Sequence, residues 1–138
     1  MTVVVDASVA VKWVIPEVLS DRADALRGRA NHLIAPDLLL PEAANVLWKK
    51  LIRRELTVRD ARQALDLLMG SGLDVRPSGP LVRRALVLAH RLKHPVYDCV
   101  YLALAQSEGA ALVTADERLL ARIARRRTRL AVINLATL

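Results

Sequence analysis

Two short apolar segments of this chain each run directly into a hydroxyl and a carboxylate. A β-branched run leads to Asp6 and Ser8 near the start, and a second apolar run leads to Thr114 and Asp116 near the other end. Such runs are typical of buried parallel strands, whose C-terminal tips meet at one edge of a sheet. The two acidic tips therefore predict one shared site.

Two further carboxylates stand at the starts of predicted helices. Pro41 and Glu42 open one helix, and Asp98 lies at the start of another. Glu42, Asn45 and Lys49 follow an i, i+3, i+7 spacing, which puts them on one helix face. A single acid at a helix start is usually an N-cap or a partner of the helix dipole, but capping alone does not account well for four acids at four element ends.

Four carboxylates at one rim would repel one another, so the cluster predicts a neutralising cation. Oxygen ligands favour Mg²⁺ or Mn²⁺ over zinc, and the three histidines and one cysteine have no zinc spacing. One or two such ions could hold a phosphodiester, lower the pKa of a bound water and stabilise the leaving oxygen. Ser8 and Thr114 are expected either to orient a carboxylate or a metal-bound water, or to bond to the local backbone.

The overall charge favours a polyanionic partner. The chain has 21 Lys and Arg against 14 Asp and Glu, a net charge of +7. This excess favours nucleic acid without distinguishing it from an ordinary basic surface. The candidates for contact with a nucleic-acid backbone are Lys12, Lys49, Arg125, Arg126 and Arg127. The arginine cluster is by default a solvated helix end, and Asp37 is expected to serve a turn rather than a metal.

The predicted elements alternate between strands and helices. Strands are expected at 2–5, 32–35, 73–76, 111–114 and 130–133, and helices at 9–14, 19–29, 41–54, 58–69, 81–92, 97–106 and 116–127. This order predicts a three-layer α/β/α domain with a central, mostly parallel sheet of four or five strands. Helix 97–106 is apolar nearly all round, so it should be buried, with Cys99 as a small hydrophobe rather than a reactive thiol. The core stripes of helices 41–54 and 58–69 are expected at Ala44, Leu47, Trp48 and Leu51, and at Val58, Ala61, Leu65 and Leu68.

Length and composition predict one globular domain over residues 1–138. Charged residues break every apolar stretch well before the roughly 18 residues that a membrane span requires. The N-terminus lacks the basic region of a signal peptide. The single cysteine excludes an intramolecular disulfide and fits the reducing cytoplasm.

Four motifs occur in a fixed order along the chain. They are Val5-Asp6-Ala7-Ser8, Pro41-Glu42-x-x-Asn45, Tyr97-Asp98-x-x-Tyr101-Leu102-Ala103-Leu104-Ala105 and Thr114-Ala115-Asp116. This set resembles a PIN domain and, more narrowly, the VapC ribonuclease toxins of bacterial and archaeal toxin–antitoxin pairs. Each motif is weak alone, but the ordered set is specific and covers essentially the whole chain, and all four acidic positions are kept.

The resemblance implies an endoribonuclease that depends on Mg²⁺, with Mn²⁺ as a substitute. It implies that Asp6, Glu42, Asp98 and Asp116 bind the metal, that Ser8 and Thr114 support them, and that Asn45 lies nearby. It also implies a homodimer, and a larger complex with a VapB-type antitoxin whose C-terminal segment occupies the active-site groove.

Three other classes of protein share part of this pattern. A phosphotransfer receiver domain pairs two acids after its first strand and has a lysine after its last, which this chain lacks. A haloacid-dehalogenase-type phosphatase requires Asp-x-Asp, but Ser8 occupies the second acidic position. A non-catalytic RNA-binding or scaffold PIN domain is the more serious alternative, and loss of cleavage on Asp6→Asn substitution would separate it from an enzyme.

Overall fold

A five-stranded, fully parallel sheet forms the centre of the molecule in the computed structural model, which describes residues 1–30 and 32–138. The strands are β1 (Thr2–Val5), β2 (His32–Pro36), β3 (Asp74–Arg76), β4 (Ala111–Thr114) and β5 (Val132–Asn134). Their order is β3-β2-β1-β4-β5, so the β-branched first strand lies in the middle and pairs with β2 and β4. The predicted α/β class and parallel sheet are confirmed.

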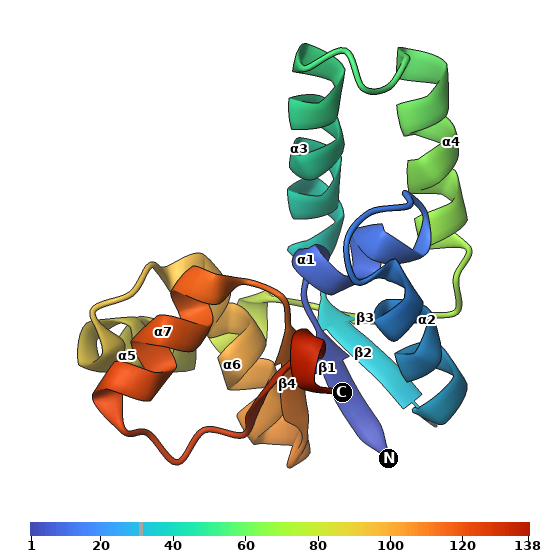
Figure 1. Ribbon diagram of the computed structural model, residues 1–138. Coiled ribbons are helices and arrows are strands. Elements are labelled where there is room, and N and C mark those ends of the chain that lie inside the picture. Colours follow the sequence, from blue (N-terminus) through green and yellow to red (C-terminus); the bar gives the residue numbers. More distant parts are fainter. Residues whose placement is uncertain (31) are drawn as a thin grey trace.

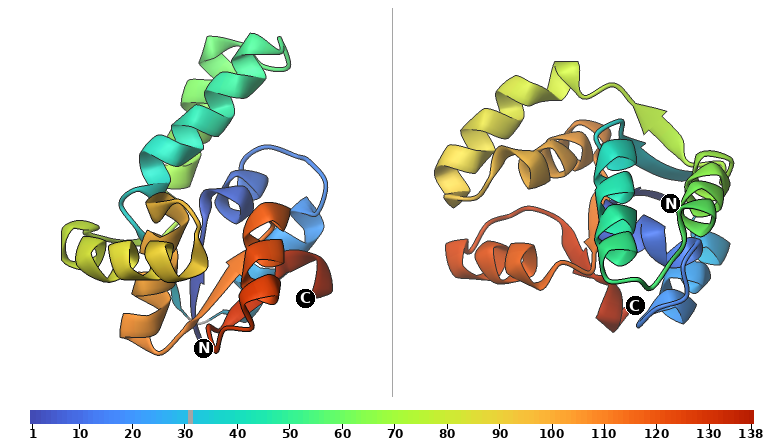
Figure 2. Two further views of the ribbon diagram at one scale, coloured as in Figure 1. Left: turned by 90° about the vertical axis from the view of Figure 1, so that its left-hand side faces the viewer. Right: turned by 90° about the horizontal axis from the view of Figure 1, so that it is seen from above.

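Helices cover both sides of the sheet (Figures 1 and 2). They are α1 (Ala7–Ala10), α2 (Ser20–Arg29), α3 (Leu39–Ile52), α4 (Val58–Met69), α5 (Val82–Leu92), α6 (Val96–Glu108) and α7 (Glu117–Arg126). Helix α6 packs across β1, β2 and β4, and α5 packs against α6. As predicted, α6 is buried nearly all round, and Cys99 within it is fully buried. Burial raises the pKa of the Cys99 thiol to about 11, so the thiol is protonated at neutral pH.

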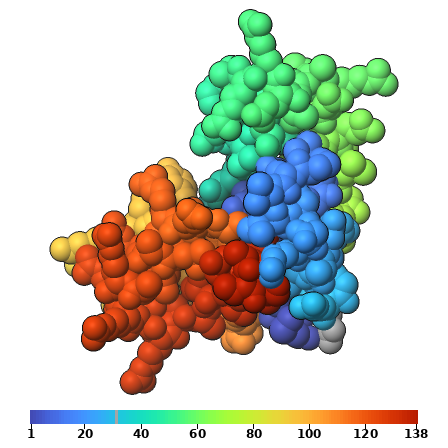
Figure 3. All heavy atoms as spheres, viewed as in Figure 1, coloured from blue at the N-terminus to red at the C-terminus, as the bar shows by residue number. Residues whose placement is uncertain are grey.

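Helices α3 and α4 form an arm that stands above the C-terminal edge of the sheet (Figures 1 and 3). Thr57 caps α4 as predicted and forms a reciprocal capping box with Asp60. The predicted core stripes are partly wrong, because Trp48 is 54% exposed and Val58 is 64% exposed. In the described part of the chain the outer faces of the arm are uncovered, whereas its buried residues face the other helix of the arm or, near its base, the main core.

Smaller differences concern the ends of elements. The helix expected at 9–14 is split into α1 and a 3₁₀ turn at Val11–Trp13, and the last strand begins two residues later than predicted. Two further 3₁₀ turns lie at Gly79–Leu81 and Leu135–Thr137. In the described residues, no helix combines the length and apolar character that crossing a membrane requires.

Candidate active site

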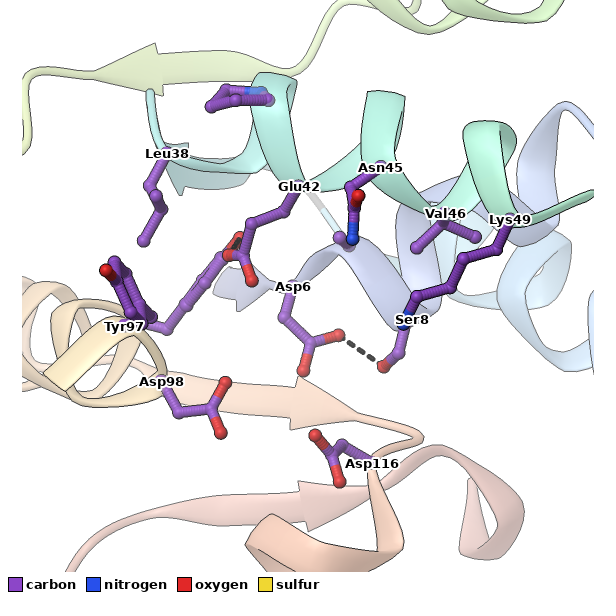
Figure 4. A pocket seen from close by; sticks show the side chains of 13 residues that line it. Asp6, Ser8, Leu38, Glu42, Asn45, Val46, Lys49, Tyr97, Asp98 and Asp116 are labelled. Atoms are coloured by element: carbon purple, nitrogen blue, oxygen red, sulfur yellow. Dashed lines mark hydrogen bonds between the residues drawn. The ribbon is translucent and has the colours of Figure 1, made fainter. Parts of the chain in front are cut away.

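The four predicted carboxylates line one open cavity of about 490 Å³ at the C-terminal edge of the sheet. Asp6 follows β1, Glu42 lies in the first turn of α3, Asp98 lies in the first turn of α6, and Asp116 is the N-cap of α7. Figure 4 shows their side chains pointing into the same space from four elements. The convergence expected from the sequence is therefore present.

Asp6 is fixed by hydroxyl groups from two neighbouring strand tips. Its Oδ1 accepts a hydrogen bond from the Ser8 hydroxyl at 2.5 Å, and its Oδ2 accepts one from the Thr114 hydroxyl. Each hydroxyl oxygen in turn accepts from a backbone N–H, that of Ala115 or of Asp116, so its proton is directed at Asp6. Ser8 and Thr114 thus orient a carboxylate, one of the two roles expected for them.

Burial changes the acidity of Asp6. The residue is only 7% exposed, and loss of water contact disfavours its charged form. Burial raises the pKa of Asp6 to about 6 from 3.8, with Asp98 adding repulsion, although the bonds from Ser8, Thr114 and Val9 oppose the shift. In the absence of a cation, the folded protein therefore favours the protonated form of Asp6 more than the unfolded chain does.

Glu42 is held by a tyrosine that the sequence reasoning did not single out as functional. The buried Tyr101 hydroxyl donates a 2.6 Å hydrogen bond to Glu42 Oε1. Burial and repulsion from Asp98 and Asp116 raise the pKa of Glu42, opposed by this bond. Burial and the adjacent Glu42 also raise the pKa of the Tyr101 phenol, so it remains a donor. Asp98 and Tyr101 are three residues apart on one helix and so share a face, which is the sequence feature that could have indicated a role for Tyr101.

Asp98 also has an unanticipated partner. His94 Nε2 lies 2.5 Å from Asp98 Oδ2, and the His94 side chain is only 8% exposed. As a whole residue His94 is partly buried, at the boundary between core and surface, and its ring faces the cavity carboxylate. A spacing of four residues can indicate contact between His94 and Asp98. Because Pro95 ends the preceding connection, the sequence did not place His94 on the same helix as Asp98.

The predicted polar face of α3 reaches the cavity. Asn45 and Lys49 line it beside Glu42, as their spacing predicted. Lys12 does not join them, because it pairs with Glu17 at 3.0 Å and its side chain is only 12% exposed, so it is not available to nucleic acid as the sequence predicted. Asp37 accepts hydrogen bonds from the backbone and hydroxyl of Ser78, in the loop role expected for it.

The donor set suits a hard divalent cation, but it is not closed around one point. Among the described residues, no three His, Cys, Asp or Glu side chains are arranged to hold an ion directly. Mg²⁺ binds through one or two carboxylates and keeps several waters, and the open cavity has room for them. The residues therefore fit a hydrated cation, while direct binding by all four acids stays a prediction.

Comparison with known proteins identifies the family. Residues 3–126 match the PIN domain family. Ribonuclease VapC3 of Pyrobaculum aerophilum is 37% identical over 123 residues, covering 86% of this chain and 92% of that protein. The chain belongs to the VapC ribonucleases of the PIN-domain family. The region of this VapC-family chain that matches the PIN domain, residues 3–126, contains all four carboxylates of the cavity.

Solved structures agree with the VapC-family fold. PAE2754 of Pyrobaculum aerophilum superposes with a TM-score of 0.72 at 28% identity, covering 99% of this chain and 91% of that chain. A toxin–antitoxin complex from Klebsiella pneumoniae gives a TM-score of 0.65 at 16% identity, covering 96% of this chain and 97% of that chain. The fold is therefore shared both with a structure at 28% identity and with one at 16% identity.

Proposed function

We propose that this chain, acting as one domain over residues 1–138, is a toxin that hydrolyses RNA phosphodiester bonds with Mg²⁺ bound at the carboxylate cavity. The observation that carries the proposal is the convergence of Asp6, Glu42, Asp98 and Asp116 on one cavity in a chain with a net charge of +7. Membership of the VapC ribonucleases supports the same activity. Mn²⁺ would occupy a site of this chemistry equally well.

Three of the four carboxylates are held by neighbouring side chains, which gives each a defined part in the proposed mechanism. Asp6 is the most rigidly held, through Ser8 and Thr114, so it sets the position of the cation. Glu42 and Asp98, positioned by Tyr101 and His94, would help to hold the hydrated cation. When bound, the cation lowers the pKa of a water and neutralises charge on the scissile phosphate.

The polar face of α3 completes the substrate site. Lys49 lines the cavity with no ion-pair partner in the described residues, whereas the adjacent Lys50 pairs with Glu17 and Glu55. The Lys49 ammonium is therefore free to contact a phosphate beside the scissile bond, and the Asn45 amide to hydrogen-bond the RNA.

We also propose that a VapB-type antitoxin covers the arm and the cavity. Helices α3 and α4 form an apolar groove of about 140 Å³ whose lining includes Leu47, Trp48, Leu51 and Leu65. An amphipathic antitoxin helix fits such a groove, and the chain beyond it would reach the carboxylate cavity, which Glu42 lines from the first turn of α3. A chain of the toxin–antitoxin complex from Klebsiella pneumoniae has the same fold. We further propose that two copies of this chain form a homodimer within that complex.

Cleavage of end-labelled structured RNAs by the purified protein, freed of any bound antitoxin, tests the activity. Specific cuts that need Mg²⁺ or Mn²⁺ and disappear with EDTA are expected. No cleavage across a broad RNA panel, with metal binding demonstrated, would favour the non-catalytic RNA-binding or scaffold alternative.

A divalent cation should stabilise the wild-type fold, because it relieves repulsion among the four carboxylates. Millimolar Mg²⁺ or Mn²⁺ is expected to raise the melting temperature by several degrees, as a ligand does when it binds only the folded state. Differential scanning fluorimetry measures this shift without relying on activity. The Asp6→Asn variant should lose most of it, and equal shifts in both proteins would argue against a metal site in the cavity.

Substituting Tyr101→Phe should lower cleavage about tenfold while keeping the buried ring. The change removes the only side-chain hydrogen bond to Glu42 found in the described residues, with a stability loss of about 1 kcal/mol. Initial rates with saturating metal measure the effect. In a double-mutant cycle, Tyr101→Phe should cost little extra in the presence of Glu42→Gln, and full additivity would show that the two side chains act independently.

A further inference from the structure

Positive charge is concentrated on one part of the molecule. Segments 77–97 and 118–138 contain ten of the 21 Lys and Arg residues and no Asp or Glu. Most of these cations lie on α5, on α7 and in the turn after α7. The two helices contact each other on one side of the sheet (Figures 1 and 2). We call this surface the α5/α7 face.

Two arginines of this face meet in a cleft between α5 and the turn after α7. Arg91 and Arg129 line a cleft of about 210 Å³ together with Gln106 and Thr128. A neighbouring cleft of about 290 Å³ shares Gln106 and Arg129, so the two depressions are continuous. Both arginines are exposed, and neither is in an ion pair within residues 1–30 and 32–138. Their guanidinium groups are available to an anionic ligand.

A row of arginines connects this cleft with the carboxylate cavity. Helix α7 begins at Asp116, which lines the cavity, and Arg118, Arg122 and Arg126 recur along it every fourth residue. That spacing puts them on one side of the helix. Ten helical residues extend about 15 Å, a distance occupied by about four phosphates of a stacked nucleic-acid strand.

We propose that the α5/α7 face binds the sugar–phosphate backbone of the RNA beside its cleavage site, with Arg91 and Arg129 as the anchor in the cleft. The inference rests on the proposed nuclease function, because the row of arginines starts at the cavity in which the RNA would be cut. Arginine suits this role, since its planar fork pairs with phosphate oxygens through two hydrogen bonds. Phosphate contacts fix the position of the RNA and leave base selection to other parts of the site.

The test uses the Asp6→Asn protein, so that RNA is bound but not cut. Fluorescence anisotropy with a fluorescein-labelled RNA hairpin gives the dissociation constant over a series of NaCl concentrations. Adding R91A and R129A together should weaken binding about tenfold or more near 0.1 M NaCl. It should also reduce the slope of log affinity against log salt by about 1.4 to 1.8, as expected for two lost phosphate contacts.

Two control variants separate a specific contact from net charge and folding. R59A removes an exposed arginine from α4, outside both clefts, and should leave the affinity nearly unchanged. The R91K and R129K pair keeps both charges but loses the fork of two hydrogen bonds, so it should keep the salt slope of the wild type while binding RNA several-fold more weakly. If the double alanine variant does not fold, R91Q and R129Q measured singly should each remove about half of the change in slope.

The outcomes are distinct for the two proposals. An unchanged slope, or equal weakening by R59A, would overturn the proposed RNA-binding face. A wild-type protein that cleaves no RNA would overturn the nuclease function, yet the binding assay with Asp6→Asn would still decide whether the α5/α7 face holds RNA.

Discussion

Asp6→Asn is expected to abolish RNA cleavage, with a loss on the order of 10²-fold or more. The amide has nearly the shape of the carboxylate but removes the charge that Ser8 and Thr114 orient toward the cavity. Rates measured with saturating Mn²⁺ and a labelled RNA substrate check the prediction. Asp74→Asn is a matched control, because Asp74 is an exposed carboxylate on β3 that pairs with Arg76 and does not line the cavity. Cleavage by Asp6→Asn at the wild-type rate would remove Asp6 from the mechanism.

The same variant should be more stable than the wild type at neutral pH when metal is removed. Because folding raises the pKa of Asp6 from 3.8 to about 6, its favourable contribution is complete below pH 3.8 and is lost as the pH rises through 6. The stability difference between variant and wild type should therefore grow by roughly 2–3 kcal/mol from pH 4 to pH 7.5. Urea unfolding in EDTA measures it, and a difference that is constant with pH would contradict the burial of the Asp6 charge.

Asp116 has two roles that substitutions can separate. Its Oδ1 accepts hydrogen bonds from the backbone N–H groups of Arg118 and Leu119, which caps α7. Asn caps as well as Asp, so Asp116→Asn should keep the melting temperature of the metal-free protein but lower cleavage on the order of 10²-fold. Asp116→Ala should lose cleavage and about 1 kcal/mol of stability.

Cleavage assays and thermal melts in EDTA for the two variants check this separation. Equal melting temperatures for both would show that the cap contributes nothing. Full activity of Asp116→Asn would show that the charge at this position is not needed.

Local pattern was enough to predict which carboxylates meet. Parallel strands place their tips at one edge, which brought Asp6 and Asp116 together, and helical periodicity placed Asn45 and Lys49 beside Glu42. The tertiary contacts of these acids were not predictable in the same way. The Tyr101–Glu42 bond joins residues 59 positions apart and depends on how α6 lies against α3.

Periodicity also shows which face of a helix is apolar without showing what covers that face. Trp48 belongs to an apolar stripe of α3, yet the arm carries it away from the body of the molecule and leaves it exposed. The error at Trp48 and the missed contact at Tyr101 have the same origin, because both depend on the packing of elements that are distant in sequence.

The central position of β1 affects when activity can arise during protein synthesis. Asp6 is among the first residues translated, but Thr114, which holds it, comes 108 residues later. The sheet neighbour β4 and the carboxylate of Asp116 are also made late, and pairing of segments so distant in sequence is slow. A growing or prematurely terminated chain therefore lacks an assembled cavity. The ribosome that makes this chain is exposed to an active nuclease only after nearly the whole chain has emerged and folded.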